Sequence, residues 1–297
     1  MNWKLSRLAA ALSILAASSA WAGDPFFFST GDPDGRIATA SRPDVPSGAE
    51  VESADDFVLG QATTITSATF TGLIAATTGL PTIGAVVVEI YRVFPLDSDT
   101  GPTSGPPTFS TAQVPTRVNS PSDAAFTTRD SSAVGELSFA TALLSSSFMT
   151  ANSVLAGGVH PLPGVFTGGN GPVAGQEMQF TVTFSSPLVL PADHYFFVPQ
   201  VQVTGGDFYW LSAPRPITSP GTPFPPGQTD LQSWIRDDAL APDWLRVGTD
   251  ITHQGPFNAA FSLTGTVAAV PEPSAIVLML AGLAALGARA RSKRRTG

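Results

Sequence analysis

Polar and apolar side chains alternate one by one along residues 177–184. Met178, Phe180, Val182 and Phe184 fall on one side of an extended chain, and the Glu, Gln and Thr residues between them fall on the other. Successive side chains of a β-strand point to opposite faces of its sheet, so this period of two predicts a strand with one buried and one solvated face. A chain with such a strand must bury one face of a sheet.

Similar stretches recur along the chain between turns rich in Gly, Pro, Ser and Asp. Further strands are predicted at residues 26–29, 56–59, 63–74, 86–94, 137–140, 195–203, 207–211, 231–236, 245–252 and 257–264. Residues 86–94 are apolar on nearly both faces, which is typical of a strand inside a sandwich. About ten strands with few helical runs predict an all-β fold, a β-sandwich of the jelly-roll kind.

Three other segments lack a strand pattern. Residues 95–121 and 213–228 contain too much Pro and Gly for strands, so we expect long loops there. Residues 142–155 form the one internal stretch with helical character, although their Ser and Thr content disfavours a helix. No repeat or shift in composition marks a second boundary, so residues 23–269 are predicted to form a single domain.

The first 22 residues have the three parts of a secretory signal peptide. Basic residues come first, residues 8–17 are apolar, and Ala20 and Ala22 supply the small-x-small pattern that signal peptidase cleaves. We therefore expect the mature chain to begin at Gly23. An uncleaved membrane anchor is the alternative.

The last 28 residues, 270–297, also consist of three parts. Pro271 and Pro273 flank Glu272 and favour an extended segment. Residues 275–288 carry no charge, and as a helix they are about 21 Å long, which is short against a hydrocarbon core of about 30 Å. Five basic residues follow at once: Arg289, Arg291, Lys293, Arg294 and Arg295. These cations hold the C-terminus in the cytoplasm, so we expect a transmembrane helix over residues 275–288 and an exported domain before it.

This order of a Pro-Glu-Pro motif, a short apolar helix and a terminal basic cluster resembles the PEP-CTERM sorting tail. The resemblance covers about the last tenth of the chain and is carried by Pro271, Glu272 and Pro273. It implies that an exosortase-type enzyme recognises the motif, releases the protein from its membrane tail and delivers it to the envelope or extracellular matrix. A permanent single-span anchor is the alternative.

The body of the chain carries a second resemblance. The stretches 54–59 (ADDFVL), 65–72, 88–91 and 208–212 (FYWLS) are similar to strands of ADDF-type jelly-roll domains in exported bacterial surface proteins. The resemblance implies a sandwich and a surface habitat, and it implies no defined activity.

Composition restricts the partners of residues 23–269. Of the 15 basic residues, two lie before this segment and five after it, which leaves eight arginines; of the 23 acids only Glu272 lies outside it, which leaves 22 and a charge of −14. Such a domain is repelled by nucleic acids and by anionic lipid surfaces. The absence of cysteine excludes disulfides and thiolate metal sites, so the exported domain must be held together by its core alone.

Calcium is the one cofactor for which the sequence offers ligands. Asp32 with Asp34, and Asp97 with Asp99, form two D-x-D turns whose carboxylates are hard oxygen ligands. Neither turn has the glutamate that an EF-hand loop places at its twelfth position. Hydrogen bonds of Asp side chains within a turn explain the same residues without a metal, and we favour that interpretation.

The sequence does not predict a catalytic centre. The three histidines, His160, His194 and His253, are far apart and show no metal-ligand spacing. A glycan-active enzyme needs two carboxylates about 5 to 10 Å apart, and Glu89, Glu136 and Glu177 lie in or beside predicted strands. Solvated surface charge accounts for most such residues, so we expect a protein without catalytic activity.

The three tryptophans of the body, Trp210, Trp234 and Trp244, lie within 35 residues, among acids and arginines. Flat rings beside carboxylates and guanidinium groups can form a sugar-binding face, which makes a carbohydrate-binding module the first alternative function. The other interpretation places the rings in the core, where Trp is usually found. The sequence thus predicts an exported surface or matrix-associated protein, with extracellular polysaccharide as a candidate partner.

Overall fold

The computed structural model describes residues 23–44, 50–76, 80–98, 118–127, 130–155, 166–219, 224–237, 244–268 and 282–283. Several predicted features lie outside these residues: Ala20 and Ala22 with the signal peptide, the motif 271–273, the basic residues from Arg289 onward, Asp99 and His160. Residues Pro25–Val267 form one compact unit. Within the described part of the chain, no helix has the length and apolar character needed to cross a bilayer. Only residues 282 and 283 of the expected transmembrane segment are described.

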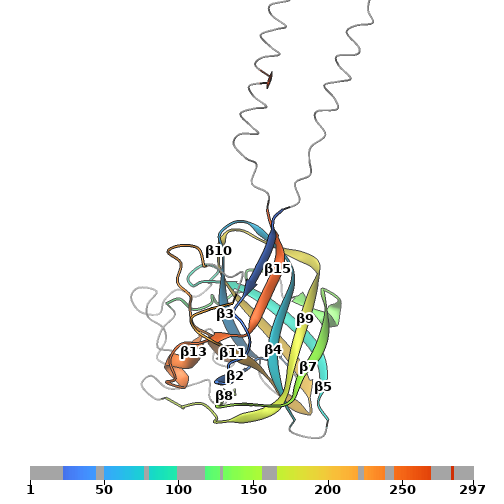
Figure 1. Cartoon of the computed structure of the whole chain (residues 1–297), viewed down its shortest axis with the longest axis vertical. Coiled ribbons are helices and arrows are strands. Elements are labelled where there is room, and N and C mark those ends of the chain that lie inside the picture. The colour runs from blue at the N-terminus through green and yellow to red at the C-terminus, as the bar shows by residue number, and fades with distance from the viewer. Residues whose placement is uncertain are drawn as a thin grey trace, which may run out of the picture. The chain divides into compact units, whose positions relative to one another are not determined.

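The larger of two sheets has nine strands (Figure 1). They are β1 (Pro25–Ser29), β2 (Ile37–Ala40), β4 (Thr63–Ala76), β7 (Leu137–Thr150), β8 (Asn152–Val154), β9 (Val173–Leu190), β11 (Gly206–Ala213), β14 (Asn258–Ala259) and β15 (Phe261–Val267). β4 lies at the centre, because β9 pairs with one of its edges while β15 and β11 share the other. β7 continues the sheet beyond β9.

The second sheet has six strands in the order β13-β12-β3-β10-β5-β6. They are β3 (Val51–Leu59), β5 (Thr82–Arg92), β6 (Asp130–Ser131), β10 (Asp193–Thr204), β12 (Trp234–Asp237) and β13 (Leu245–Arg246). All of its pairings are antiparallel. The predicted all-β sandwich is therefore confirmed.

The alternation of residues 177–184 is realised in β9. Phe180, Val182 and Phe184 are buried, whereas Thr181 and Thr183 are exposed. Phe180 stacks on Phe70 of the neighbouring strand β4, with ring centroids 5.0 Å apart. The period of two thus identified both the strand and the face that it buries.

Two local expectations were wrong. Residues 142–155, the candidate helix, belong to β7 and β8, because β7 pairs with β9 along most of its length and tertiary pairing overrides a weak helical preference. The strand expected at 245–252 ends at Arg246, and the chain continues as a short π-helix, Val247–Ile251.

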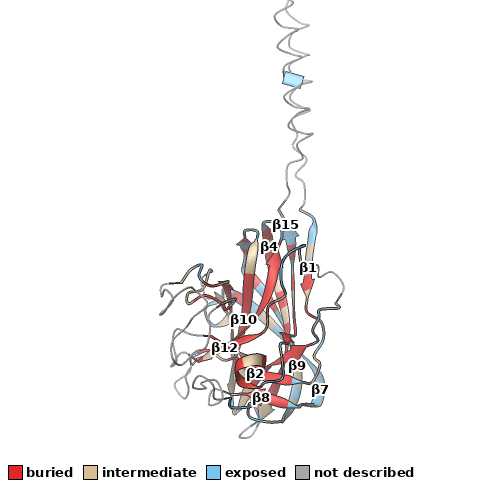
Figure 2. Ribbon diagram, turned by 90° about the vertical axis from the view of Figure 1, so that its left-hand side faces the viewer, coloured by how far each residue is buried: buried red, intermediate tan, exposed pale blue. Residues whose placement is uncertain are grey.

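The main core lies between the two sheets, since its buried side chains come from strands of both, such as β4 and β9 of the larger sheet and β5 and β10 of the smaller. Figure 2 shows these buried residues in red. Aromatic side chains dominate this core: Phe197 from β10 stacks on Phe261 from β15 at 5.1 Å, and the Trp210 indole meets Phe261 at 5.7 Å. Burial of aromatic rings is the largest favourable contribution available to a domain without disulfides.

The middle of the six-stranded sheet is buried on both faces. Every residue of β3 is buried, which is uncommon for a strand of a sandwich with one solvated side. Ala54 of β3 packs with Phe196, Trp234 and Trp244 in a cluster separate from the main core. The loop segments around Ser122 and Leu231 lie over this cluster, and we call this side of the sheet the covered face.

Candidate functional site

The tryptophans lie inside the protein. Trp210, Trp234 and Trp244 are 0%, 1% and 1% exposed. The Trp210 indole N–H donates to the Ala260 carbonyl oxygen at 2.9 Å, and that of Trp244 donates to the Ser122 carbonyl oxygen at 3.1 Å. The rings therefore belong to packed interiors, in agreement with the interpretation that places them in the core, and they do not form the alternative, an exposed sugar-binding face.

Alternation along the strands brings charged residues to the covered face. Arg236 of β12 lies opposite Glu52 of β3, and Glu89 and Tyr91 project from β5. The Arg236 guanidinium forms an ion pair with Glu52 and donates to the Tyr91 hydroxyl at 2.9 Å. It also lies 4.6 Å from the centroid of the Trp244 ring, a cation–π geometry.

One phenolic proton serves two carboxylates in this cluster. The Tyr91 hydroxyl lies 2.8 Å from Glu52 Oε1 and 2.6 Å from Glu89 Oε2, and it donates to one of them at a time. Burial alone would raise the pKa of Glu52, but Arg236 and the hydrogen bonds from its neighbours hold that pKa below its usual value. Burial and the charge of Glu52 raise the pKa of Tyr91.

The carboxylates of Glu52 and Glu89 lie close to that of a third glutamate, Glu50. Glu50, Glu52 and Glu89 each place an oxygen within 4.8 Å of the others. Glu50 accepts a hydrogen bond from Gln200 at 2.7 Å, and Arg236 already supplies a positive charge to Glu52. The group and its partners therefore cross-link β3, β5, β10 and β12.

The two aspartates of the ADDF stretch also form cross-links. Asp55 accepts a hydrogen bond from the Ala259 backbone N–H at 2.8 Å. Asp56 binds His194 Nε2 at 2.6 Å and accepts from the Leu231 backbone N–H at 3.1 Å. His194, near the start of β10, is thus held at the edge of the covered face by a buried carboxylate.

Asp55 is fully buried, and this gives a testable pH dependence. Burial raises the pKa of Asp55 well above its usual value, and the neighbouring charges of Asp56 and Asp230 raise it further. Because the native state favours the neutral carboxyl, the stability linked to Asp55 is present below the unfolded pKa of about 3.9 and is lost as the pH rises toward the folded pKa.

We therefore expect the free energy of unfolding of Asp55→Asn to depend less on pH than that of the unchanged protein, from about pH 4 up to the folded pKa of Asp55. Relative to the unchanged protein, the free energy of unfolding of the variant should gain up to about 1.4 kcal/mol for each pH unit above pH 4, until the folded pKa is reached. Urea unfolding at pH 4, 5 and 6 measures the difference. Parallel profiles for the two proteins would show that Asp55 is not held neutral by the fold.

Three of the four aspartates proposed for calcium are described, and each has its own surroundings; Asp99 lies outside the described residues. Asp34 accepts hydrogen bonds from the Arg36 backbone N–H at 3.0 Å and from the Ser212 hydroxyl at 2.5 Å. Asp97, in a different loop, forms an ion pair with Arg92. Asp32 is exposed, and its charge adds to burial in raising the pKa of Glu177. The turn contacts of Asp34 are those of an Asx turn, which the sequence interpretation favoured.

The other acids and histidines named from sequence do not converge in the described structure. Glu136 is exposed and accepts from the Ser131 backbone N–H at 3.0 Å. His253 is exposed, has a positive φ of 58°, and packs edge-on to Phe166 at 3.6 Å.

A polar cavity of about 280 Å³ lies beside the covered face. Its polar and aromatic lining includes Asn119, Arg215, Asp230, Gln232, Trp234 and Arg246. Arg215 donates to the carbonyl oxygens of Asp230 and Leu231 and to Asn258 Oδ1, while Arg246 binds Asp250 through two hydrogen bonds of 2.9 and 2.6 Å. Burial and the charge of Asp56 raise the pKa of Asp230.

Part of this cavity was missed by sequence reasoning. Asp230, Trp234 and Arg246 belong to the cluster noted in the sequence, but Arg215 and Gln232 were not singled out. Arg215 is the one charged residue of the Pro- and Gly-rich loop 213–228.

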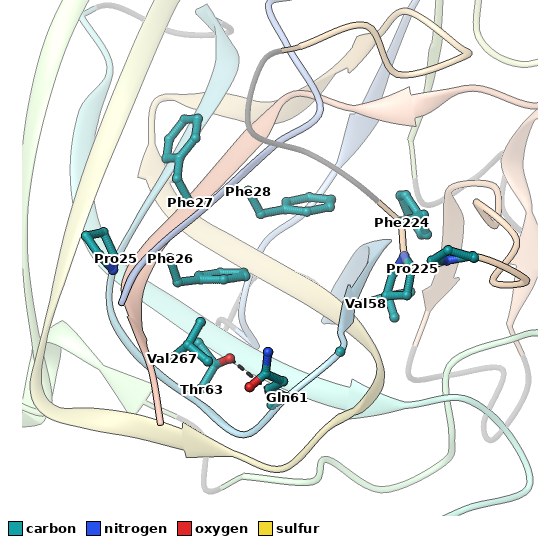
Figure 3. Close-up of a pocket in the computed structure, with 12 residues that line it drawn as sticks. Pro25, Phe26, Phe27, Phe28, Val58, Gln61, Thr63, Phe224, Pro225 and Val267 are labelled. Carbon is teal, nitrogen blue, oxygen red and sulfur yellow. Dashed lines mark hydrogen bonds between the residues drawn. The ribbon is translucent and has the colours of Figure 1, made fainter. Parts of the chain in front are cut away.

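A second, larger groove of about 410 Å³ opens between β1 and the end of β3 (Figure 3). Phe26 and Phe28 point to the same side of β1, toward Val58 and Phe224, and Phe27 points to the other side. The Thr63 hydroxyl donates to the Gln61 carbonyl oxygen at 2.9 Å along its rim. None of the described residues that line this groove is charged, so the polar cavity is the better candidate for a polar ligand.

Comparison with known proteins identifies the C-terminal segment. Residues 269–295 match the family model described as the PEP-CTERM protein-sorting motif. No curated protein and no solved structure matches the chain, so the similarity to ADDF-type domains stays a prediction. The motif indicates an exported protein that an exosortase-type enzyme recognises and sorts to the cell envelope.

Proposed function

We propose that this chain is a non-catalytic protein of the cell surface or extracellular matrix, and that its sandwich domain associates with extracellular polysaccharide. The observation that supports this proposal most directly is that acids on the covered face are bound by other side chains of the protein. Glu52, Glu89 and Asp56 bind Arg236, Tyr91 and His194 beneath the loops, where they cross-link strands. Groups engaged in this way stabilise a scaffold and are poorly placed to reach a glycosidic bond.

A glycan-active enzyme is the competing function, and one assay separates the two. The full chain is incubated with polysaccharide from the producing cells, and both retention on the polymer and release of reducing ends are measured. We expect retention without new reducing ends, and an unrelated acidic protein serves as the control for charge. Reducing ends that increase with protein concentration would contradict a non-catalytic role.

Sorting supports the proposed location and can be tested at the motif. We expect Glu272→Ala, in the producing cell, to shift the protein from the matrix fraction to the membrane fraction, because the motif is no longer recognised while the apolar segment remains. Ser274→Ala, next to the motif, is the matched control and should fractionate as the unchanged protein does. Equal matrix fractions for both variants would exclude recognition through Glu272.

A carbohydrate-binding module is the second candidate function. The polar cavity favours it, because this cavity combines carboxylate, amide and indole groups with apolar walls in one small space. This role requires no catalysis and is compatible with a matrix location.

A further inference from the structure

We infer that two copies of this chain pair through the free edge of β7, so that their larger sheets join into one continuous antiparallel sheet. The occupant of this edge is a second copy of the protein, related to the first by a two-fold axis that passes beside Ala140. The inference concerns assembly, and it does not rest on the proposed association with polysaccharide.

β7 is the one long edge strand among the strands that the structure describes. It pairs with β9 on one side, and no other described strand pairs with it (Figure 1). β7 has 14 residues, whereas the other edge strands are short: β1 has five residues and begins with Pro25, β8 has three, and β6, β13 and β14 have two each. A free edge presents unpaired backbone N–H and C=O groups, so β7 offers a template for a further strand.

β7 also lacks the residues with which proteins commonly protect an edge. Charged side chains and Pro are the usual means, and Leu137–Thr150 contains neither. Bulges interrupt the pairing with β9 after Leu143, so the regular part of the edge is Leu137–Leu143. Besides the ladder with β9, no backbone hydrogen bond to another segment of the described chain involves this part. Its outward backbone groups are therefore open to a second strand.

The side chains of this part leave apolar surface uncovered on the core side of the sheet. Phe184 and Val182 of β9 point into the main core. Their partners on β7 are Leu137 and Phe139, and Leu143 follows in the same row. Leu137 is buried, but Leu143 is 54% exposed. The core-facing row thus ends in an exposed leucine beside the free edge.

The edge is self-complementary under a two-fold axis. When Ala140 of one copy lies opposite Ala140 of the other, Leu143 of each copy lies opposite Leu137 of the other copy. Opposite residues of an antiparallel pair share a face, so both leucine pairs form on the core side of the joined sheet. The small residues Ser138 and Ala142 meet on the other face. Such a contact uses the same surface of both copies and closes after two.

The distribution of charge favours a copy at this edge. Residues 23–269 carry a charge of −14, so two copies repel each other where their acids meet. Residues 137–176 contain no Asp, Glu, Lys or Arg, and an uncharged strand therefore meets the same uncharged strand. Pairing centred on Ala140 also keeps the two Glu136 residues about 27 Å apart at roughly 3.4 Å per residue, beyond the Debye length of about 10 Å. A cationic peptide would find no carboxylate on β7 itself to bind.

Site-directed cysteines test the contact, because the chain has no cysteine of its own. The full chain carrying Ala140→Cys is purified in detergent, oxidised with copper phenanthroline and analysed on a non-reducing gel. We expect a disulfide-linked dimer that dithiothreitol returns to monomer. Opposite Cα atoms in an antiparallel pair are about 4.5–5.5 Å apart, within the range of about 4.4–6.8 Å that a disulfide bridges.

Thr181→Cys is the matched control for Ala140→Cys. Thr181 is exposed and is the partner of Ala140 on β9, one strand further from the edge. In the joined sheet the two Thr181 residues are three strand spacings apart, about 14 Å, which is too far for a disulfide. This variant should therefore stay monomeric on the gel at the same protein concentration.

A charge on the edge should separate the two copies. Leu143→Lys places an ammonium group beside Leu137 of the other copy, and we expect the dissociation constant of the dimer to rise about 10-fold or more. Sedimentation equilibrium of the full chain in a density-matched detergent measures it. Val189→Lys provides the comparison, since Val189 is 71% exposed on β9, outside the part that pairs with β7, and it should leave the dissociation constant unchanged. Thermal unfolding of both variants reports whether the fold is kept.

Three results would overturn the inference. A protein that is monomeric at every concentration would leave the β7 edge to a strand of another protein. Equal cross-linking of Ala140→Cys and Thr181→Cys would mean that the disulfides form by random collision. Equal dissociation constants for Leu143→Lys and Val189→Lys would place the contact between copies elsewhere in the chain. Retention on polysaccharide is measured separately, so none of these results decides the proposed function.

Discussion

Replacing Arg236 with methionine is expected to lower the free energy of unfolding by about 3–5 kcal/mol. The substitution removes the cation that pairs with Glu52 and donates to the Tyr91 hydroxyl. Glu52 then remains buried without its cation, beside the Tyr91 hydroxyl. An uncompensated buried charge is far more costly than the removal of a whole ion pair.

Arg36→Met is the matched control, since Arg36 is exposed and donates one hydrogen bond to the Gln254 carbonyl oxygen. It should change the free energy of unfolding by no more than about 0.5 kcal/mol. Adding Glu52→Gln to Arg236→Met should recover part of the loss, because the stranded charge is removed as well. Equal urea midpoints for the two single variants would show that Arg236 does not hold the cluster together.

The second large effect is expected at Trp210. Trp210→Ala should lower the free energy of unfolding by about 3–5 kcal/mol, because the indole is fully buried and its removal leaves a cavity in the main core. The ring packs edge-on against Phe197 and Phe261, and its N–H donates to the Ala260 carbonyl oxygen. The carbonyl oxygen of Ala260 would lose that partner.

Phe27→Ala provides the comparison for Trp210→Ala. Phe27 is 48% exposed, so truncating its ring removes less buried surface and should cost about 1 kcal/mol or less. Guanidinium unfolding curves of the two variants measure the difference between their free energies of unfolding. A loss at Trp210 as small as the loss at Phe27 would mean that the core repacks around the missing indole.

The loss of stability expected for Arg236→Met reflects how much the covered face contributes to the free energy of unfolding. A sandwich sheet needs apolar residues on one face only, yet Trp234, Trp244 and Tyr91 are buried on the other face together with the carboxylates of Glu52, Asp56 and Glu89. The loops around Ser122 and Leu231 are held there by hydrogen bonds to Trp244 and Asp56. These contacts place Asp230 and Trp234 where they can line the polar cavity.

Local pattern was enough to identify most strands, because side-chain alternation and turn residues act over a few neighbours. Residues 63–74 and 195–203 were predicted as strands and lie in β4 and β10. The pattern failed at residues 142–155, where pairing with β9 outweighs local preference. It also could not show that β3 is buried on both faces, since that depends on loops from distant parts of the chain.

The sequence by itself determined the strand-forming character of the body, its negative charge and the sorting motif at residues 269–295, because each of these is a property of adjacent residues. Only the tertiary structure decided that the tryptophans are buried and that Asp230, Arg215 and Trp234 share one cavity. The physical reason is that burial and hydrogen-bond pairing depend on which segments meet in space. Contacts such as that between the Leu231 N–H and Asp56 join residues 175 positions apart.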